Sequence, residues 1–212
     1  MRDRRPLVAA AGLALALTLT GCVAQAPSAP PSPSPSSPAA VRPESAKAAG
    51  FQNPAADAAR PTTATRPVRI VIPAIDVNAS LIDLARGADG VLAAPPSTVL
   101  DKAGWYAKGT VPGQIGPAVI AGHVDWVDRI AVFHRLDQVQ PGDVITIVMN
   151  DGSKIRFEVG DVRKVSKFHF PTASVYGPTP DPELRVITCG GPWDDARDIY
   201  SENVIVSATE LG

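Results

Sequence analysis

Side chains able to act as nucleophiles or proton carriers are few in this sequence, which contains 2 cysteines and 3 histidines. Cys189 follows the run Leu184–Thr188, and His123 follows the apolar run Ala118–Ala121 and a glycine. Both are therefore expected where a strand meets a loop, a place that exposes a side chain to substrate. A thiol is a strong nucleophile, and an imidazole transfers protons near neutral pH. On its own, Cys189 also fits a buried, inert thiol; its pairing with His123 favours catalysis.

The other histidines give weaker signals. His134 lies among Val132, Phe133 and Leu136, where a packed or surface position is expected. His169 lies between two phenylalanines and is a candidate substrate-cleft residue. None of the histidines has the spacing of a zinc ligand, and a lone cysteine cannot supply a thiolate cluster. The sequence therefore predicts neither a metal site nor a cofactor.

Residues 1–22 have the features of an export signal. Three arginines precede the uncharged run Leu7–Thr20, whose 14 residues are too short to cross ~30 Å of hydrocarbon comfortably. The run ends in Leu-Thr-Gly-Cys, which resembles the lipobox of bacterial lipoproteins and predicts lipid attachment at Cys22. An uncleaved signal anchor, in which Cys22 is incidental, is the alternative. Both place the rest of the chain outside the cytoplasm, anchored to the outer face of the cell membrane.

Residues 23–67 are expected to form a disordered tether. They contain 10 prolines and 13 alanines, with Phe51 as the only aromatic residue. Such a segment cannot bury enough apolar area to offset the entropy of ordering the chain. As a stiff spacer it would reach on the order of 130 Å at most, and as a flexible coil about 35–40 Å. A tether of this kind would carry a catalytic domain into the cell wall.

The charge pattern excludes one broad class of function. From Val68 onward there are 13 Lys and Arg against 18 Asp and Glu, without basic blocks. A nucleic-acid-binding domain would concentrate positive charge on one face or helix. The sequence therefore predicts no nucleic-acid partner and a dispersed set of solvated charges.

Residues 68–212 have the pattern of one compact all-β domain, because short β-branched runs recur between turn-forming residues. Asn150-Asp151-Gly152 predicts a hairpin turn, and the alternation of Lys154–Val159 predicts one wet and one dry face. A helical turn is expected near Asp128–Leu136. A closed barrel is favoured over a sandwich because closure leaves no exposed strand edge. The predicted strands are Val68–Ile72, Ala118–Ala121, Val144–Met149, Ile155–Val159, Leu184–Thr188 and Val204–Val206.

Together these pieces resemble the sortase family, and most closely the class F sortases of actinobacteria. The resemblance is carried by a His strand, Ala118–His123, and a Cys strand, Leu184–Cys189. It extends in order over nearly all of residues 68–210. Supporting pieces are Ala131–Leu136 with Pro141–Asp143, Phe170–Thr172, Val175–Gly177, Cys189–Gly191 and Asn203–Val206.

The resemblance implies a closed, eight-stranded sortase-type β-barrel with short helical turns and a cleft formed by strands and loops. Cys189 would attack the Thr–Gly carbonyl of a C-terminal sorting signal, often of LPXTG type, to give a thioester. An amine from a peptidoglycan precursor or another protein would then release the product, with His123 as acid and base. The implied partners are secreted proteins with sorting signals, those amines and the membrane, and the enzyme is expected to be a monomer.

Sortases also use an arginine that steadies the developing oxyanion, and Arg197 is the only arginine after Cys189. Aligning the last strand from its end places Asn203 nearest the usual arginine and Arg197 in the preceding loop. Arg197 is therefore the predicted donor, with Asn203 as a substitute. A surface ion pair with its acidic neighbours is the alternative for Arg197. Thr188, Asn203 and His169 are the predicted substrate-binding residues.

Other kinds of protein stay open on the sequence alone. An L,D-transpeptidase would also be exported and mostly β, but a Ser-His-Gly-Cys cluster is usual there, and Cys189 has no adjacent histidine. A papain-like wall hydrolase would place its cysteine before its histidine, the reverse of the order here. A non-catalytic lipoprotein that binds wall peptides would have no need to pair Cys189 with His123.

Overall fold

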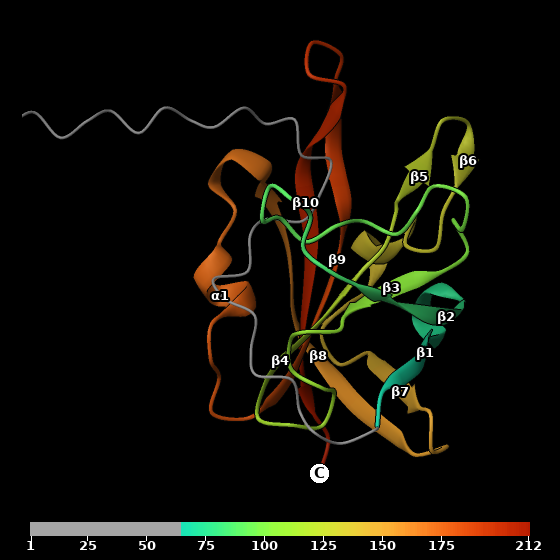
Figure 1. The fold of residues 1–212 in the computed structure, drawn as a ribbon, viewed down its shortest axis with the longest axis vertical. Helices are drawn as coiled ribbons and strands as arrows, with labels where there is room; N and C mark the ends of the chain where they lie inside the picture. Colours follow the sequence, from blue (N-terminus) through green and yellow to red (C-terminus); the bar gives the residue numbers. More distant parts are fainter. Residues whose placement is uncertain (1–64) are drawn as a thin grey trace, which may run out of the picture. The chain divides into compact units, whose positions relative to one another are not determined.

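The computed structural model of the chain describes residues 65–212. The predicted signal segment, Cys22 and nearly all of the predicted tether lie outside the described residues. Eight strands form a closed barrel in the order β1–β2–β3–β4–β9–β10–β8–β7 (Figure 1), which confirms the predicted fold class. These strands are β1 (Pro67–Ile72), β2 (Val77–Leu84), β3 (Ala103–Tyr106), β4 (Gly116–Ala121), β7 (Val144–Met149), β8 (Lys154–Ser166), β9 (Pro182–Asp194) and β10 (Ile199–Glu210).

The remaining elements are short. Within residues 65–212 they comprise a separate two-stranded hairpin, one α-helix and three 3₁₀ turns. No helix in this range is long and apolar enough to cross a membrane. The short elements are β5 (Asp125–Trp126), β6 (Arg129–Ile130), α1 (Thr172–Tyr176), η1 (Pro73–Ile75), η2 (Leu136–Gln138) and η3 (Lys167–His169).

All of the predicted runs lie within barrel strands, whereas β2 and β3 were not predicted. The predicted turn joins β7 to β8, with a left-handed φ of 85° at Gly152. There the side chain and backbone of Ser153 donate hydrogen bonds to the Asp151 carboxylate, which lowers the pKa of Asp151. The helical turn expected near Asp128–Leu136 is wrong in position: the chain there contains the extended strand β6, and η2 begins only at Leu136.

Strand β8 shows how the sequence pattern sets the two faces of the barrel. Phe157 and Val159 are buried, whereas Arg156 and Glu158 between and before them are exposed. Successive side chains of a strand point to opposite faces, so the apolar set fills the barrel interior. Burying each of these large apolar side chains contributes about 1.5–3 kcal/mol to folding.

Strands β4, β9 and β10 are apolar on both faces. Residues such as Ile120 and Val186 belong to the cluster inside the barrel. Ile187 and Ile205 belong to a second cluster outside it, which Val175 of α1 completes. Strands covered on both sides read as continuous apolar runs, which is why β4 and β9 were visible in the sequence. These strands therefore make a rigid base for whatever follows their ends.

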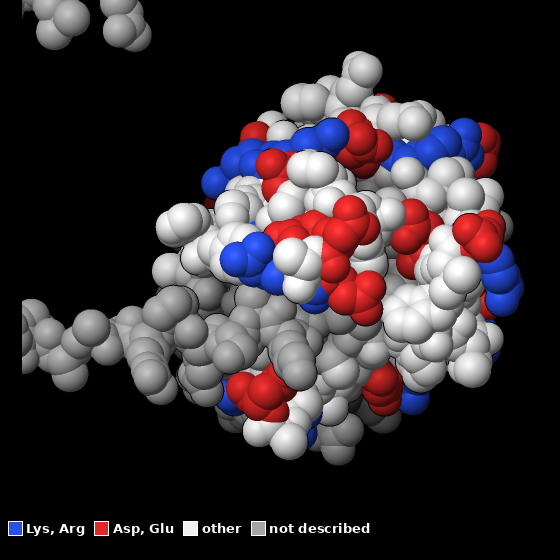
Figure 2. Space-filling view, turned by 90° about the horizontal axis from the view of Figure 1, so that it is seen from above, with Lys and Arg blue, Asp and Glu red and all other residues white. Residues whose placement is uncertain are grey.

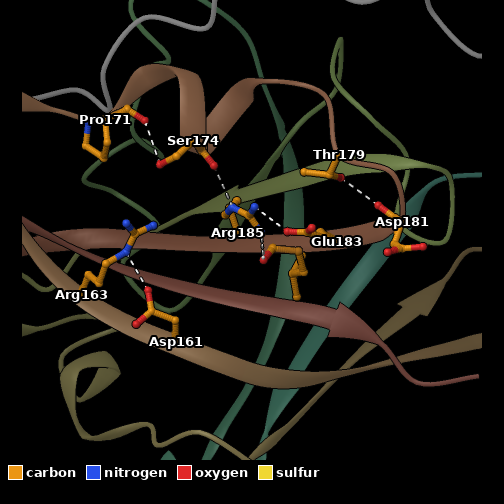
Figure 3. Close-up of polar contacts among 9 residues, drawn as sticks. Asp161, Arg163, Pro171, Ser174, Thr179, Asp181, Glu183 and Arg185 are labelled. Atoms are coloured by element: carbon orange, nitrogen blue, oxygen red, sulfur yellow. Dashed lines mark hydrogen bonds and ion pairs between the residues drawn. The ribbon is translucent and has the colours of Figure 1, made fainter.

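The segment between β8 and β9 is fastened to the barrel by Arg185, whose side chain lies between α1 and β9 (Figure 3). Its Nε donates to the backbone oxygen of Ser174 at 3.3 Å, and its guanidinium pairs with Glu183 at 2.5 Å. Arg185 is only 6% exposed, so these contacts satisfy a buried charge. The same segment includes η3, whose position the site depends on.

Candidate active site

Cys189 lies near the end of β9 and is the free cysteine of the described residues. Its register partner on the neighbouring strand β10 is Asn203. Because side chains alternate along a strand, Cys189 shares the face of Ile187, outside the barrel interior. The thiol is half-buried, so it is held by the strand and still reachable from solvent.

His123 follows the parallel neighbour of β9, strand β4. The register pairs Ala121 with Ile187, so His123 and Cys189 each lie two residues beyond the same pair. The backbone amide of Gly122 donates to the Ile187 oxygen at 3.1 Å, which continues the pairing towards both residues. Parallel strands run in the same direction, so both side chains emerge at one end of the barrel.

The imidazole of His123 is oriented by a backbone carbonyl. Its Nε2 lies 2.7 Å from the oxygen of Pro95, and since a carbonyl only accepts, Nε2 carries a proton and donates it. The ring also meets the indole of Trp126 edge to face, with centroids 5.6 Å apart. A side chain at Gly122 would collide with Phe133, so this glycine allows the chain to pass close to the core before His123.

Cys189 and His123 line one cleft with a volume of about 350 Å³. One wall comes from the β5–β6 hairpin and the other from the β9–β10 hairpin, and both hairpins extend past the same end of the barrel (Figure 1). Seen from above in Figure 2, Lys and Arg are interspersed with Asp and Glu, without a broad basic area. The other lining residues are Val124, Asp125, Trp126, Val127, Lys167, Trp193, Asp198, Ile199 and Tyr200.

A hydrogen bond joins the two walls of this cleft. The hydroxyl of Tyr200 on β10 donates to the Asp125 carboxylate of β5 at 2.5 Å. This bond, followed by burial and the nearby negative charge, raises the pKa of Tyr200 to about 12. The hydroxyl therefore stays protonated, and remains a donor, throughout the neutral range. The Tyr200 ring also packs edge to face on Trp193 at 5.2 Å.

Lys167 is the lining residue that the sequence did not point to. It is the first residue of η3, it is 5% exposed, and its Nζ lies 3.3 Å from Cys189 Sγ. Lys167 is separated from Cys189 by 22 positions in the sequence, in a segment that contains other lysines. No sequence motif distinguished it from solvated lysines such as Lys164.

Arg197, the predicted oxyanion donor, lies in the turn between β9 and β10 and is not among the residues that line the cleft. Its guanidinium forms an ion pair with Asp194 at 2.7 Å, and this hydrogen bond lowers the pKa of the Asp194 carboxyl. The same guanidinium lies over the ring of Phe168, 5.3 Å from its centre. The Arg197 side chain is 53% exposed, as in the surface ion pair that was its alternative.

The structure brings Thr188 and Asn203 close to Cys189, but both are buried. Thr188 Oγ1 donates to the Gly122 oxygen at 2.9 Å, and Asn203 Nδ2 donates to the Thr188 oxygen at 3.1 Å. Asn203 Oδ1 is buried without a partner within residues 65–212. These two side chains brace the backbone around Cys189.

The other two histidines lie elsewhere. His169, a predicted substrate-binding residue, is exposed at the end of η3 and is not a lining residue of the cleft. His134 lines a separate hollow, and its Nδ1 donates to the Ala131 oxygen at 3.0 Å. Within the described range, no group of three or more His, Cys, Asp or Glu is arranged to hold a metal ion.

Comparisons with known proteins agree with this architecture. A family model described as the Sortase domain matches residues 70–211. Sortase C-1 from Actinomyces oris is a similar solved structure, with 23% identity, a TM-score of 0.53, and coverage of 69% of this chain and 75% of that one. A search of curated proteins gave no match.

Two further solved structures have the same fold. Sortase A from Corynebacterium diphtheriae is 25% identical, with a TM-score of 0.52 and coverage of 69% of this chain and 62% of that one. Sortase C1 from Streptococcus agalactiae, in complex with MTSET, is 18% identical, with a TM-score of 0.52 and coverage of 68% and 67%. Since the family model spans most of the chain and the barrel places a free thiol beside a histidine in one cleft, the chain belongs to the sortase family of cysteine transpeptidases.

Proposed function

We propose that this sortase uses Cys189 as nucleophile and His123 as general acid and base on a C-terminal sorting signal of LPXTG type. The Cys189 thiolate attacks the Thr–Gly carbonyl, so that a C–S bond forms. The C–N bond then breaks while His123 gives a proton to the leaving amine. An amine from a wall precursor or another protein attacks the thioester and loses its proton to His123, and the C–S bond breaks to restore the thiolate.

The register of β4 against β9 is the observation that carries this proposal. It puts Cys189 and His123 at the same distance beyond one parallel residue pair, and both line the same cleft. Nucleophilic catalysis needs a nucleophile and a proton carrier within reach of one substrate bond. Two adjacent, fully buried strands hold both side chains in place without depending on a mobile loop.

The bonding of the imidazole supports its role in proton transfer. Because Nε2 of His123 donates to Pro95, Nδ1 is the nitrogen left to exchange a proton with the substrate amine. Within residues 65–212 this Nδ1 has no hydrogen-bond partner. A general base must have its lone pair free and its ring fixed, and both conditions are met here.

The walls of the cleft suit the apolar positions of a sorting signal. Trp126 and Val127 from the β5–β6 hairpin are 45% and 83% exposed, and Trp193 from the opposite wall is 48% exposed. Apolar side chains left open to water gain free energy when a peptide covers them. The cleft is also roomy enough to admit an extended peptide that reaches Cys189.

The N-terminal attachment and the class of sortase are further parts of the proposal. We infer that residues 1–22 direct export, that Cys22 carries lipid, and that residues 23–67 tether the catalytic domain, residues 68–212, at the outer face of the membrane. The resemblance of the His and Cys strands supports class F. Replacement of Cys22 by Ser should abolish fatty-acid labelling and leave an unprocessed precursor; equal labelling would favour an uncleaved anchor.

Incubation of the purified chain with an LPXTG-containing peptide and a primary amine tests the proposed reaction. Mass spectrometry is expected to find a product cleaved between Thr and Gly and joined to the amine. Water competes with the amine for the thioester, so some hydrolysed peptide accompanies it. A peptide that stays intact, with the chain shown to be folded by circular dichroism, would contradict the proposal.

A further inference from the structure

We propose that Lys167 is the third catalytic residue of this sortase, the cation that stabilises the Cys189 thiolate and then the oxyanion formed by its attack. The inference rests on the proposed role of Cys189 as nucleophile. It assigns to a lysine from η3 a task for which the sequence offered Arg197 or Asn203. The reason lies in what each of these side chains contacts.

The contact between Lys167 and Cys189 is direct. Nζ lies 3.3 Å from Sγ, within hydrogen-bonding range for a sulfur acceptor. Within residues 65–212 this is the only polar partner of the ammonium, and no carboxylate lies at ion-pair distance from it. Among the described residues that line the cleft, Lys167 is also the only Lys or Arg.

Burial makes this contact informative. Lysine is rarely buried without a partner, because removing an ammonium from water costs far more than a single neutral hydrogen bond returns. Lys167 is only 5% exposed, and the one group placed to compensate its charge is the sulfur of Cys189. A negatively charged sulfur gains the same Coulomb attraction in return, so the pair favours the nucleophilic form of the thiol.

The strand order explains how the lysine reaches the thiol. β9 lies between β4 and β10, and β8 lies beyond β10. Ser166 at the end of β8 pairs with Glu202 of β10, whose next residue, Asn203, pairs with Cys189. Lys167 therefore reaches Cys189 from across β10. The histidine and the cation consequently approach the sulfur from opposite neighbours of β9.

The other candidate donors are already engaged. The Arg197 guanidinium is exposed and paired with Asp194, and Nδ2 of Asn203 donates to the Thr188 backbone. Lys167 has three donor hydrogens, of which a single contact to Sγ uses one. When Sγ bonds to the carbonyl carbon, the negative charge moves to an oxygen attached to that carbon. An ammonium beside Sγ is then placed to stabilise it.

Replacement of Lys167 by Met tests the inference, since Met keeps the apolar stem and removes the charge. Two rates are measured at one pH: alkylation of Cys189 by iodoacetamide, which requires no peptide, and single-turnover acylation by an LPXTG peptide. We expect alkylation to slow by on the order of tenfold or more. Acylation is expected to slow by about 10²–10³, the typical effect of losing an oxyanion donor. Lys167→Arg should recover part of both rates because it restores the charge.

Lys164→Met is the matched control. Lys164 lies on β8 in the same segment, is 53% exposed, and pairs with Asp137 at 3.0 Å. Both rates should stay within about twofold of the unmodified enzyme, because an exposed ion pair contributes little. Thermal unfolding of all variants separates a chemical effect from a loss of structure.

Two results would overturn the inference. Unchanged alkylation and acylation in folded Lys167→Met would make the lysine a packing residue. A peptide map that finds the acyl group on Lys167 would make its amine an acceptor rather than a stabilising charge. Neither result affects the proposed function, which fails only if Cys189 itself proves dispensable.

Discussion

The floor of the catalytic cleft and its rim hold their side chains in different ways. The floor consists of His123, Lys167 and Cys189, which lie on or beside strands whose backbones are hydrogen-bonded on both sides. Their orientations are set by named contacts, such as that of His123 Nε2 with the Pro95 oxygen and that of Lys167 Nζ with Cys189 Sγ. Catalytic groups held in this way need little rearrangement in the transition state.

The rim consists of Trp126, Val127, Trp193 and Arg197, all on the two hairpins that extend past the barrel. Trp126, Val127 and Trp193 are 45–83% exposed, and Val127 has a left-handed φ of 55°, which is strained for a β-branched residue. Side chains of this kind can adapt to a bound peptide. The difference implies that floor variants alter the chemical step, whereas rim variants alter binding.

Cys189→Ala should have the largest effect in the molecule. Because it removes the nucleophile and the only free thiol of the described residues, cleavage of a sorting peptide should fall to background. The fold should be unchanged, because the thiol is half-buried and a small side chain replaces it. Turnover above background in a folded variant, followed by mass spectrometry, would sink the assignment.

His123→Ala should follow, with kcat/KM lower by at least ~10² because protonation of the leaving amine is lost. His134→Ala is the control, since His134 lines a separate hollow and should leave the rate nearly unchanged. Steady-state kinetics at neutral pH measure both. Similar losses in the two variants would mean that the histidines have been assigned wrongly.

Arg197→Ala compares the rim with the floor directly. Its guanidinium is exposed and paired with Asp194, so we expect kcat/KM to change by less than about tenfold. Asn203→Ala should instead lower stability by about 1 kcal/mol, because the buried bond to Thr188 is lost. A fall of 10²–10³ for Arg197→Ala would move the oxyanion donor to the rim, as the sequence suggested, and would erase the division drawn here.

Trp126→Ala should raise KM about fivefold with little change in kcat, the result of losing roughly 1 kcal/mol of apolar contact with the peptide. The residue lies on the rim but also touches the His123 ring, with centroids 5.6 Å apart. A variant that lowers kcat while KM stays constant would show that the indole orients the imidazole instead. The split between the two constants is therefore the informative readout.

Tyr200→Phe should have the smallest effect, confined to alkaline pH. The folded state raises the Tyr200 pKa from 10.0 to about 12, so between these values the native chain retains a proton that the unfolded chain has released. The free energy of unfolding therefore decreases as pH rises through this window. Denaturant unfolding at pH 10 and 12 should show a smaller decrease for Tyr200→Phe. An equal decrease in both proteins would mean that the bond to Asp125 does not form in solution.

The sequence alone was sufficient for the parts of the fold where pattern and environment agree. β4 and β9 are covered on both faces, so they read as apolar runs, and the residues that follow them, His123 and Cys189, stood out as candidates. β2 and β3 were missed. β3 has only four residues, and its parallel pairing with β2 joins segments well apart in the chain, where no local turn signal marks it.

The contacts of the site could not be read from the sequence for a similar reason. Lys167 reaches Cys189 across an intervening strand, and the register that brings them together is set by the closure of the whole barrel. Likewise, the alignment placed Asn203 near an expected arginine but could not show that its amide is occupied by the Thr188 backbone. Motif spacing identified the reacting residues, and three-dimensional pairing identified their neighbours.

Trapping of the acyl-enzyme tests the central claim most directly. The purified chain is mixed with an LPXTG peptide in the absence of an added amine, quenched in acid, and analysed by intact mass and peptide mapping. The account predicts a mass increase equal to the acyl part of the peptide, located on Cys189, that disappears when an amine is added. An adduct on another residue, or cleavage of the peptide by folded Cys189→Ala, would contradict it.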